Sequence, residues 1–282
     1  MKKLSILLVA LLATLALQAQ TVRHTMMDAG QEREYYLFVP DSLSPQRPLL
    51  FVLHGYGGKA DGYFPAMQQA ASKYGFVLCY PQGLKDPGKG KPGWNVGYPS
   101  QQGWKQDDVA FILRLKKKLI KEYHLNARNC FFSGMSNGGE MCYVMAYQQP
   151  QAFAAICSFA GLTMEWLYRT QPRGIVPFME IHGTVDRTSA WEGDPENNGG
   201  WGKYVAVPMA VGRLVSEADC THEVAEELPL YKPESNRVIR HRYLGGKVEI
   251  RLYEVIGGKH SIGDKDLDVC EEMWQFFAAY LH

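Results

Sequence analysis

Short apolar runs alternate with amphipathic segments along most of the chain, which is the pattern of strands that alternate with helices. Apolar-rich runs bounded by glycine, proline or polar residues predict buried strands at residues 49–53, 76–80, 130–132, 154–159, 176–181 and 248–255. Apolar positions three and four residues apart predict helices at residues 64–74, 107–123, 137–148 and 265–281. Asp107 or Asp108 stands where the N-cap of the second helix belongs.

This alternation predicts an α/β fold with a mainly parallel central sheet and helices on both of its faces. The stretches 21–27 and 34–39 are β-rich and precede the alternating part. In such sheets, ligands bind beyond the carboxyl ends of the strands. Two long segments, 82–106 and 187–204, follow strand ends and lack a strand or helix pattern. We therefore expect both to overhang one site.

The N-terminal residues form a segment of their own. Lys2 and Lys3 precede an apolar run over residues 4–17, and small or polar residues follow it. This arrangement is typical of a bacterial secretory signal peptide and is too short for a membrane span. We expect a signal peptide over residues 1–20, a single domain over residues 21–282, and a periplasmic or secreted location.

Composition and charge exclude some classes of partner. The 282 residues are 46% hydrophobic and 21% charged, as in an ordinary globular protein, and the formal net charge is +1. Without the two lysines of the predicted signal peptide the chain stays close to neutral. A near-neutral surface does not gather nucleic acid or an anionic membrane, so we expect neither a nucleic-acid partner nor a membrane anchor. The oligomeric state is left open.

Export would permit disulfides between the six cysteines. Cys79, Cys130 and Cys157 lie in apolar strand-like runs, where a cysteine is usually a small buried hydrophobic residue. Cys220 and Cys270 lie in polar surroundings and are the first candidate pair for a disulfide. There is no Cys-x-x-Cys spacing, so a zinc site is not expected.

The strongest local signal is the Gly-x-Ser-x-Gly motif of residues 134–138, between a predicted strand and a predicted helix. A serine at such a turn is held in strained backbone geometry, with its hydroxyl clear of the sheet. Glycines are needed there because neighbouring chain passes too close for a Cβ atom. The N-terminus of the helix also directs its N–H groups at this point. We predict that Ser136 is a nucleophile, whereas Ser133 belongs to the strand end.

Residues 54–58, His-Gly-Tyr-Gly-Gly, follow the predicted strand 49–53. They resemble the His-Gly-Gly type of loop that supplies one half of an oxyanion hole. Acyl transfer develops negative charge on the former carbonyl oxygen, and each preorganised N–H donor is worth about 2.7–4 kcal/mol. We predict the backbone N–H groups of Tyr56 and Asn137 as the donors. His54 precedes the serine and is expected to brace the loop.

An acid and a base should follow the serine, each after a strand. Asp186 meets this condition, and a buried carboxylate there would hold an imidazole in one tautomer. Its rivals, Asp194 and Glu196, lie farther into the polar segment, and His182 is expected to pack at the strand end. His260 lies on a Gly-rich loop between the last predicted strand and the last helix, which favours it as the general base.

The order Ser136, Asp186, His260 is that of the α/β-hydrolase fold. With these residues in place, the chain resembles the group of polyhydroxybutyrate depolymerases, feruloyl esterases and acetylxylan esterases (carbohydrate esterase family one). The resemblance extends from about residue 35 to the C-terminus and rests on residues 53–55, 80–83, 94–95, 107–109, 134–139, 182–186 and 258–260. It implies this fold, the Ser–Asp–His roles, and hydrolysis of acyl esters without a cofactor.

We therefore expect a serine carboxylesterase that acts through an acyl-enzyme on feruloyl or acetyl esters of plant polysaccharides. One alternative is a polyhydroxybutyrate-type polyester depolymerase, and the non-enzymatic alternative is a carbohydrate-binding module on a hydrolase scaffold. No metal is expected; Asp194, Glu196 and Asn197 offer oxygen ligands for calcium but lack EF-hand spacing. Aromatic side chains of the long segments are candidate substrate contacts: Trp94, Trp104, Trp191 and Trp201, with Tyr56 and Tyr98.

Overall fold

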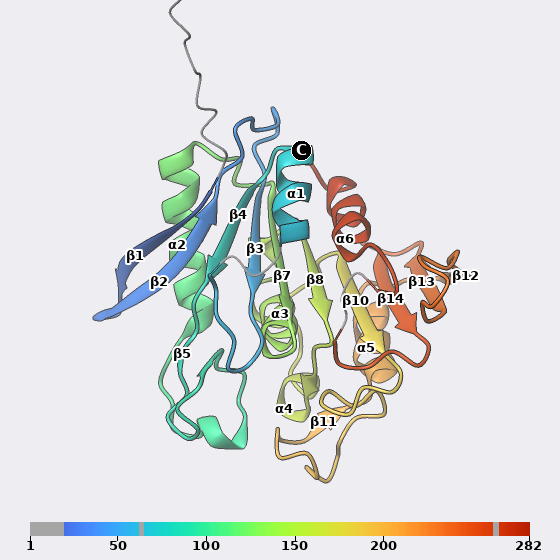
Figure 1. The fold of residues 1–282 in the computed structure, drawn as a ribbon. Helices are drawn as coiled ribbons and strands as arrows, with labels where there is room; N and C mark the ends of the chain where they lie inside the picture. Colours follow the sequence, from blue (N-terminus) through green and yellow to red (C-terminus); the bar gives the residue numbers. More distant parts are fainter. Residues whose placement is uncertain (1–19, 62–64, 262–264) are drawn as a thin grey trace, which may run out of the picture.

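The computed structural model describes residues 20–61, 65–261 and 265–282, so nearly all of the predicted signal peptide lies outside the described residues. Figure 1 shows the elements in chain order. The strands are β1 (Thr21–Asp28), β2 (Gln31–Phe38), β3 (Leu49–Leu53), β4 (Val77–Pro81), β5 (Leu84–Lys85), β6 (Pro92–Gly93), β7 (Cys130–Met135), β8 (Ala155–Phe159), β9 (Thr163–Met164), β10 (Phe178–Gly183), β11 (Tyr204–Val205), β12 (His222–Glu227), β13 (Val238–Leu244) and β14 (Ile250–Val255). The helices are α1 (Pro65–Tyr74), η1 (Pro99–Gln101), α2 (Asp108–Tyr123), α3 (Asn137–Gln148), η2 (Pro150–Ala152), α4 (Glu165–Tyr168), α5 (Val207–Glu217) and α6 (Val269–Ala278).

A ten-stranded sheet forms the centre of the fold, in the order β1-β2-β4-β3-β7-β8-β10-β14-β13-β12. The inner strands from β4 to β14 pair in parallel. The antiparallel strands lie at its two edges. Every residue of β3, β4, β8 and β10 is buried, as expected for parallel strands covered on both faces. The predicted α/β class and mainly parallel sheet are confirmed.

Helices cover both faces of the sheet. Residues of α2, α3 and α5 pack into one buried apolar cluster, and residues of α1 and α6 pack into another. Because the inner strands are parallel, the loops that follow them meet at the edge of the sheet that lies lowest in Figure 1, where α4 and β11 also lie. The residues predicted to act at the strand ends therefore lie at one edge of the sheet.

Besides the strands of two residues and the helices of three or four residues, the sequence analysis missed three longer elements, for two different reasons. All six residues of β12 are exposed, so this edge strand has no buried face to produce an alternation of apolar and polar positions. Its neighbour β13 is only partly buried, so it too lacks a clear alternation of buried and exposed positions. Helix α5, by contrast, buries residues at helical spacing, namely Val207, Ala210, Val211 and Leu214, and this signal was present but not used.

The proposed disulfide between Cys220 and Cys270 is wrong. Cys220 packs against the apolar cluster under α2, α3 and α5, whereas Cys270 belongs to the cluster under α1 and α6, on the opposite face of the sheet. Their polar sequence surroundings misled the prediction, because Cys220 lies in the connection between α5 and β12 and Cys270 lies in the first turn of α6. Cys79, Cys130 and Cys157 are fully buried, as predicted.

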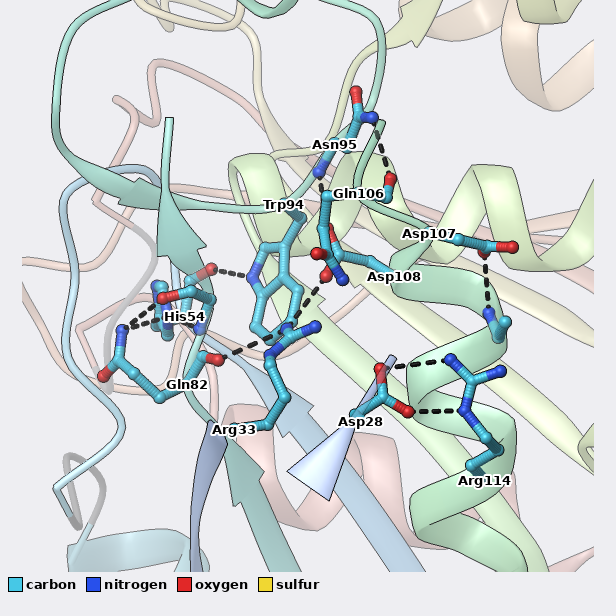
Figure 2. A network of polar contacts seen from close by, with 12 residues as sticks. Asp28, Arg33, His54, Gln82, Trp94, Asn95, Gln106, Asp107, Asp108 and Arg114 are labelled. Atoms are coloured by element: carbon cyan, nitrogen blue, oxygen red, sulfur yellow. Dashed lines mark hydrogen bonds and ion pairs between the residues drawn. The ribbon is translucent and has the colours of Figure 1, made fainter. Parts of the chain in front are cut away.

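A buried ion pair joins β2 to the first turn of α2. The guanidinium of Arg33 donates to Asp108 Oδ1 at 2.9 Å and lies 3.6 Å from the centre of the Phe111 ring. Asp108 Oδ2 accepts the Asn95 backbone N–H at 2.9 Å, so the pair also holds the 82–106 segment, as Figure 2 shows. Burial lowers the pKa of Arg33 and raises the pKa of Asp108, so each charge depends on the other.

The preceding residue has a different task. Asp107 is the N-cap of α2, and its Oδ1 accepts the Ala110 backbone N–H at 2.9 Å. Its side chain makes this contact at the exposed surface, so it satisfies one helix donor without burying a charge. Asp107 therefore caps the helix, whereas the adjacent Asp108 forms the buried ion pair.

We predict that Asp108→Ala lowers the free energy of unfolding by about 3–5 kcal/mol, because it leaves the Arg33 guanidinium buried without its partner. Asp107→Ala is the matched control and should cost only about 1 kcal/mol, the value of a cap. Urea titration followed by circular dichroism measures both. Equal losses in the two variants would contradict the assignment.

Candidate active site

Ser136 occupies a strained turn between β7 and α3. Its φ is +55° and its ψ is −120°, a conformation that non-glycine residues rarely adopt and that costs on the order of 1–3 kcal/mol. A Cβ atom on Gly134 would lie 2.5 Å from the Gly138 carbonyl oxygen, and one on Gly138 would lie 2.5 Å from the Leu53 carbonyl oxygen. The glycines of the motif are therefore required by close packing. Ser133 is fully buried.

The side chains of Ser136, His260 and Asp186 form one hydrogen-bonded line. His260 Nε2 lies 3.0 Å from Ser136 Oγ, and its Nδ1 lies 2.7 Å from Asp186 Oδ2. Asp186 Oδ1 accepts the backbone N–H groups of Thr188 and Ser189 at 2.7 and 2.9 Å. The Asp186 side chain is fully buried, whereas that of His260 is 26% exposed. The carboxylate is thus fixed and the imidazole is open to a ligand.

The loops that carry Asp186 and His260 are joined to each other. They follow β10 and β14, which are neighbours in the sheet. The Val185 N–H donates to the Gly258 carbonyl oxygen at 3.0 Å, and the Gly257 N–H donates to Thr184 Oγ1 at 2.9 Å. These bonds hold the two loops in register beyond the strand ends.

His54 braces its own loop, as predicted. Its Nε2 accepts the Gly83 backbone N–H at 2.9 Å and lies 3.0 Å from Gln82 Nε2, so its Nδ1 carries the proton and donates to the Gly55 carbonyl oxygen at 2.7 Å. Burial lowers the pKa of His54, which keeps this imidazole neutral. Figure 2 shows the contacts between His54 and Gln82.

Trp94 connects the two parts of the predicted oxyanion hole. Its indole N–H donates to the His54 carbonyl oxygen at 2.9 Å. Its backbone N–H donates to Asn137 Oδ1 at 2.6 Å, and its carbonyl oxygen accepts from Asn137 Nδ2 at 3.1 Å. Trp94 is fully buried, so its prediction as a substrate contact is wrong. Its ring fixes the loop of His54 against the start of α3 instead.

A pocket of about 230 Å³ opens at the serine. The described residues that line it are His54, Gly55, Tyr56, Gly58, Lys59, Met135, Ser136 and His260. Within the described part of the chain, the backbone N–H groups of Tyr56 and Asn137 donate to no protein acceptor. Both donors remain available for a ligand atom in this region.

The other tryptophans of the long segments have different surroundings. Trp104 is half-buried, and its carbonyl oxygen accepts from the side chain of Asn95. Trp191 is also half-buried and lies edge-on against His182, with ring centres 6.0 Å apart. Trp201 is half-buried within an aromatic cluster that includes Tyr56. Trp201 thus contacts Tyr56 of the serine pocket, as the buried Trp94 contacts His54.

A buried Glu–His pair lies directly behind Asp186. His182 Nδ1 lies 2.9 Å from Glu180 Oε1, and its Nε2 lies 2.8 Å from the Ser189 carbonyl oxygen and 3.6 Å from Asp186 Oδ2. Burial opposes a charge on His182, but the contact with Glu180 outweighs burial and raises the pKa of His182. The pair braces the turn that carries Asp186. His182 is fully buried at the strand end, as predicted, whereas Glu180 was missed.

Glu140 lies one turn beyond Ser136 in α3, and its N–H donates to the Ser136 carbonyl oxygen at 2.8 Å. Burial raises the pKa of Glu140 to about 8, although contacts with Tyr98 and Asn137 oppose this shift. The carboxyl group is therefore mainly neutral at pH 7. This keeps a negative charge away from the helix end where Asn137 presents its N–H group.

The oxygen ligands considered for calcium are used within their own loop. Asp194 Oδ1 and Oδ2 accept the backbone N–H groups of Asn198 and Gly199 at 2.9 and 2.7 Å. Asn197 Oδ1 accepts the Gly202 N–H at 2.7 Å. In residues 20–61, 65–261 and 265–282, His, Cys, Asp and Glu side chains form no group of three that could hold a metal ion. These residues shape the turn.

Comparison with known proteins agrees with the resemblance. The family model described as esterase PHB depolymerase matches residues 33–169. A bifunctional acetylxylan esterase/xylanase of Neocallimastix patriciarum is 28% identical over 174 residues, which cover 59% of this chain and 23% of that protein. Feruloyl esterase B of Neurospora crassa is 30% identical over 135 residues, or 45% of this chain and 43% of that protein. The chain spans less than half the length of both relatives.

The structure of an acetyl xylan esterase from Aspergillus awamori matches with a TM-score of 0.62 at 15% identity, and the match covers 91% of this chain and 99% of that one. This chain has the α/β-hydrolase fold. The resemblance to the group of polyhydroxybutyrate depolymerases, feruloyl esterases and acetylxylan esterases is confirmed. Across the residues that the structure describes, this chain contains no helix long and apolar enough to cross a membrane.

The buried carboxyl of Glu140 predicts a pH dependence of stability. In the unfolded chain this group titrates near 4.5 and in the folded chain near 8, so the folded state binds the extra proton between these values. The free energy of unfolding should therefore fall as pH rises through this window, by at most about 1.4 kcal/mol per pH unit from this group.

Glu140→Gln mimics the neutral carboxyl and should lack this loss. Urea titrations at several pH values should show the variant gaining stability relative to the unsubstituted chain as pH rises from about 5 to 8. A constant difference between the two proteins over this range would show that Glu140 titrates in the same way in both states.

Proposed function

We propose that this α/β-hydrolase is an exported serine carboxylesterase that hydrolyses acetyl or feruloyl esters of plant polysaccharides. The observation that carries the proposal is the unbroken line of hydrogen bonds, 3.0 Å from Ser136 Oγ to His260 Nε2 and 2.7 Å from His260 Nδ1 to Asp186 Oδ2. The esterases among its relatives support the same class of reaction. We also propose that residues 21–282 act as one catalytic domain, because both apolar clusters pack on a single sheet.

In the first step, Ser136 Oγ attacks the ester carbonyl carbon while His260 Nε2 takes its proton. Asp186 holds the imidazole in the required tautomer and stabilises the imidazolium. The N–H groups of Tyr56 and Asn137 stabilise the negative charge on the former carbonyl oxygen. His260 then gives the proton to the oxygen of the leaving alcohol, and an acyl-enzyme remains. Water, activated by His260, attacks the acyl-enzyme and releases the acid.

The size of the serine pocket bears on the acyl group. Its volume of about 230 Å³ lies below the roughly 300–1,000 Å³ of pockets that enclose drug-sized ligands. We propose that a short acyl group such as acetyl occupies this pocket. The export of the chain rests on the sequence of residues 1–20, which has the charge and apolar pattern of a signal peptide.

Ser136→Ala is expected to lower kcat for hydrolysis of 4-nitrophenyl acetate by at least about 10⁴-fold, because the nucleophile is lost. A fluorophosphonate probe should label the unsubstituted chain and not the variant. Ser133→Ala is the matched control and should keep both activity and labelling. Labelling that persists in Ser136→Ala, or none in the unsubstituted chain, would instead favour a non-catalytic binding module.

Substrate class is tested by rates on methyl ferulate, acetylated xylan and short hydroxybutyrate oligomers. We expect acetylated xylan to give the highest kcat/KM. The matched family model is described by its polyhydroxybutyrate depolymerase members, which favours a polyester depolymerase as the second candidate. A higher kcat/KM on the hydroxybutyrate oligomers would establish that candidate in place of the polysaccharide esterase.

A further inference from the structure

A groove of about 350 Å³ is lined by residues of η1 and α4. Figure 1 shows α4 at the edge of the sheet where the inner strands end. Trp166 lines it and is 42% exposed, although large apolar side chains are usually covered. The indole N–H of Trp166 donates to the Val96 carbonyl oxygen at 3.1 Å, which fixes the orientation of the ring. A Cβ atom on Gly97 would lie 2.6 Å from this indole nitrogen, so the ring packs directly on the backbone.

The wall that supports the Trp166 ring is preformed. Gln101 is buried, and its Oε1 accepts the backbone N–H groups of Val96, Gly97 and Tyr98 at 3.0–3.1 Å. Its Nε2 donates to the Trp94 carbonyl oxygen at 2.8 Å. One side chain thus holds three consecutive residues of the turn in place. A ligand that enters this groove meets a surface that needs no ordering.

The rim of the groove is polar. Gln102 and Lys203 are exposed, and Glu165 is partly exposed. The contact with Arg169 lowers the pKa of Glu165, so this carboxylate is an acceptor at neutral pH. An amide, an ammonium and a carboxylate together offer both donors and acceptors around an apolar platform. This combination matches a sugar ring, which has apolar C–H faces and hydroxyl groups along its edge.

An aromatic cluster joins this groove to the serine pocket. Tyr98 lines the groove, and its ring centre lies 5.9 Å from that of Tyr56, which lines the serine pocket. Trp201 packs against both rings, at 5.2 and 5.5 Å. A residue that lines one cavity is therefore in ring contact with a residue that lines the other. A substrate that occupied both would extend across this cluster.

We propose that the Trp166 groove is a saccharide subsite, which binds a neutral sugar residue of the ester substrate while Ser136 attacks the acyl group. The proposal rests on the proposed function and deepens it, because it assigns the alcohol part of the substrate to a built surface. The sequence analysis missed Trp166, since this residue lies in a short helix outside the two long segments.

The test compares binding with hydrolysis. Calorimetry measures binding of unesterified xylotriose and cellotriose to the full chain, and kinetics compare 4-nitrophenyl acetate with acetylated xylotriose. Trp166→Ala should weaken trisaccharide binding and lower kcat/KM on acetylated xylotriose about ten-fold or more, as for other anchoring aromatic side chains. It should leave kcat/KM on 4-nitrophenyl acetate unchanged. Trp166→Phe should restore part of the loss. Tyr231→Ala removes an equally exposed aromatic ring that lines neither cavity, and as the matched control it should change neither.

The outcomes separate the subsite from the reaction. If the unsubstituted chain binds neither trisaccharide, or if Trp166→Ala and Tyr231→Ala bind equally well, the subsite is wrong even when the esters are hydrolysed. If no ester is hydrolysed, the proposed function is wrong, and the binding measurement still decides the subsite. Gln102→Leu keeps the Trp166 ring in place, and it should weaken binding of both trisaccharides by removing one rim donor and acceptor. Unchanged binding in this variant would contradict the proposed rim.

Discussion

The lateral order of the parallel strands is the constraint on which the candidate site depends. Ser136 follows β7, whereas Asp186 and His260 follow the adjacent strands β10 and β14. Strand β8 lies between β7 and β10, and hydrogen bonds join its end to both neighbours. The Phe159 carbonyl oxygen accepts the Ser136 N–H at 2.8 Å, and the Ala160 N–H donates to the Ile181 carbonyl oxygen at 2.9 Å. A shift of one strand by one residue would break these bonds and move the serine away from the imidazole. The three side chains therefore meet only if the sheet keeps its register.

Buried polar groups surround this line and fix the loops that the sheet itself leaves free. Arg33 and Asp108 hold the 82–106 segment, and Trp94 within that segment holds the loop of His54 against α3. On the other side, Glu180 and His182 brace the turn of Asp186. Each buried charge is costly to desolvate, and each is matched by a partner. The desolvation cost therefore falls on the loops whose positions the proposed chemistry depends on most.

The sequence was sufficient to predict those features of the site that depend on neighbouring residues in the chain. The strand-turn-helix context identified the strained turn of Ser136, because close packing at Gly134 and Gly138 leaves a sequence pattern. By contrast, the sequence of an irregular segment does not show which of its side chains are exposed. Trp94 was therefore expected at the surface but is fully buried, whereas Trp166 was not considered and is exposed. The pairing of Glu180 with His182 was not predicted either, because the sequence of an apolar strand does not show which residue a polar side chain within it contacts.

The 82–106 segment shows why specificity is harder to predict than chemistry in this fold. Its inward side chain, Trp94, is bound to His54 and Asn137, which are required for the shape of the serine pocket. Its outward turn, held by the buried Gln101, forms one wall of the Trp166 groove. Because Gln101 also bonds the Trp94 carbonyl oxygen, the two surfaces share a single backbone. Changes on the outer surface would be free to alter which sugar the proposed subsite accepts, provided that they leave this backbone in place. Substrate preference can therefore vary while the geometry around Ser136 stays constant.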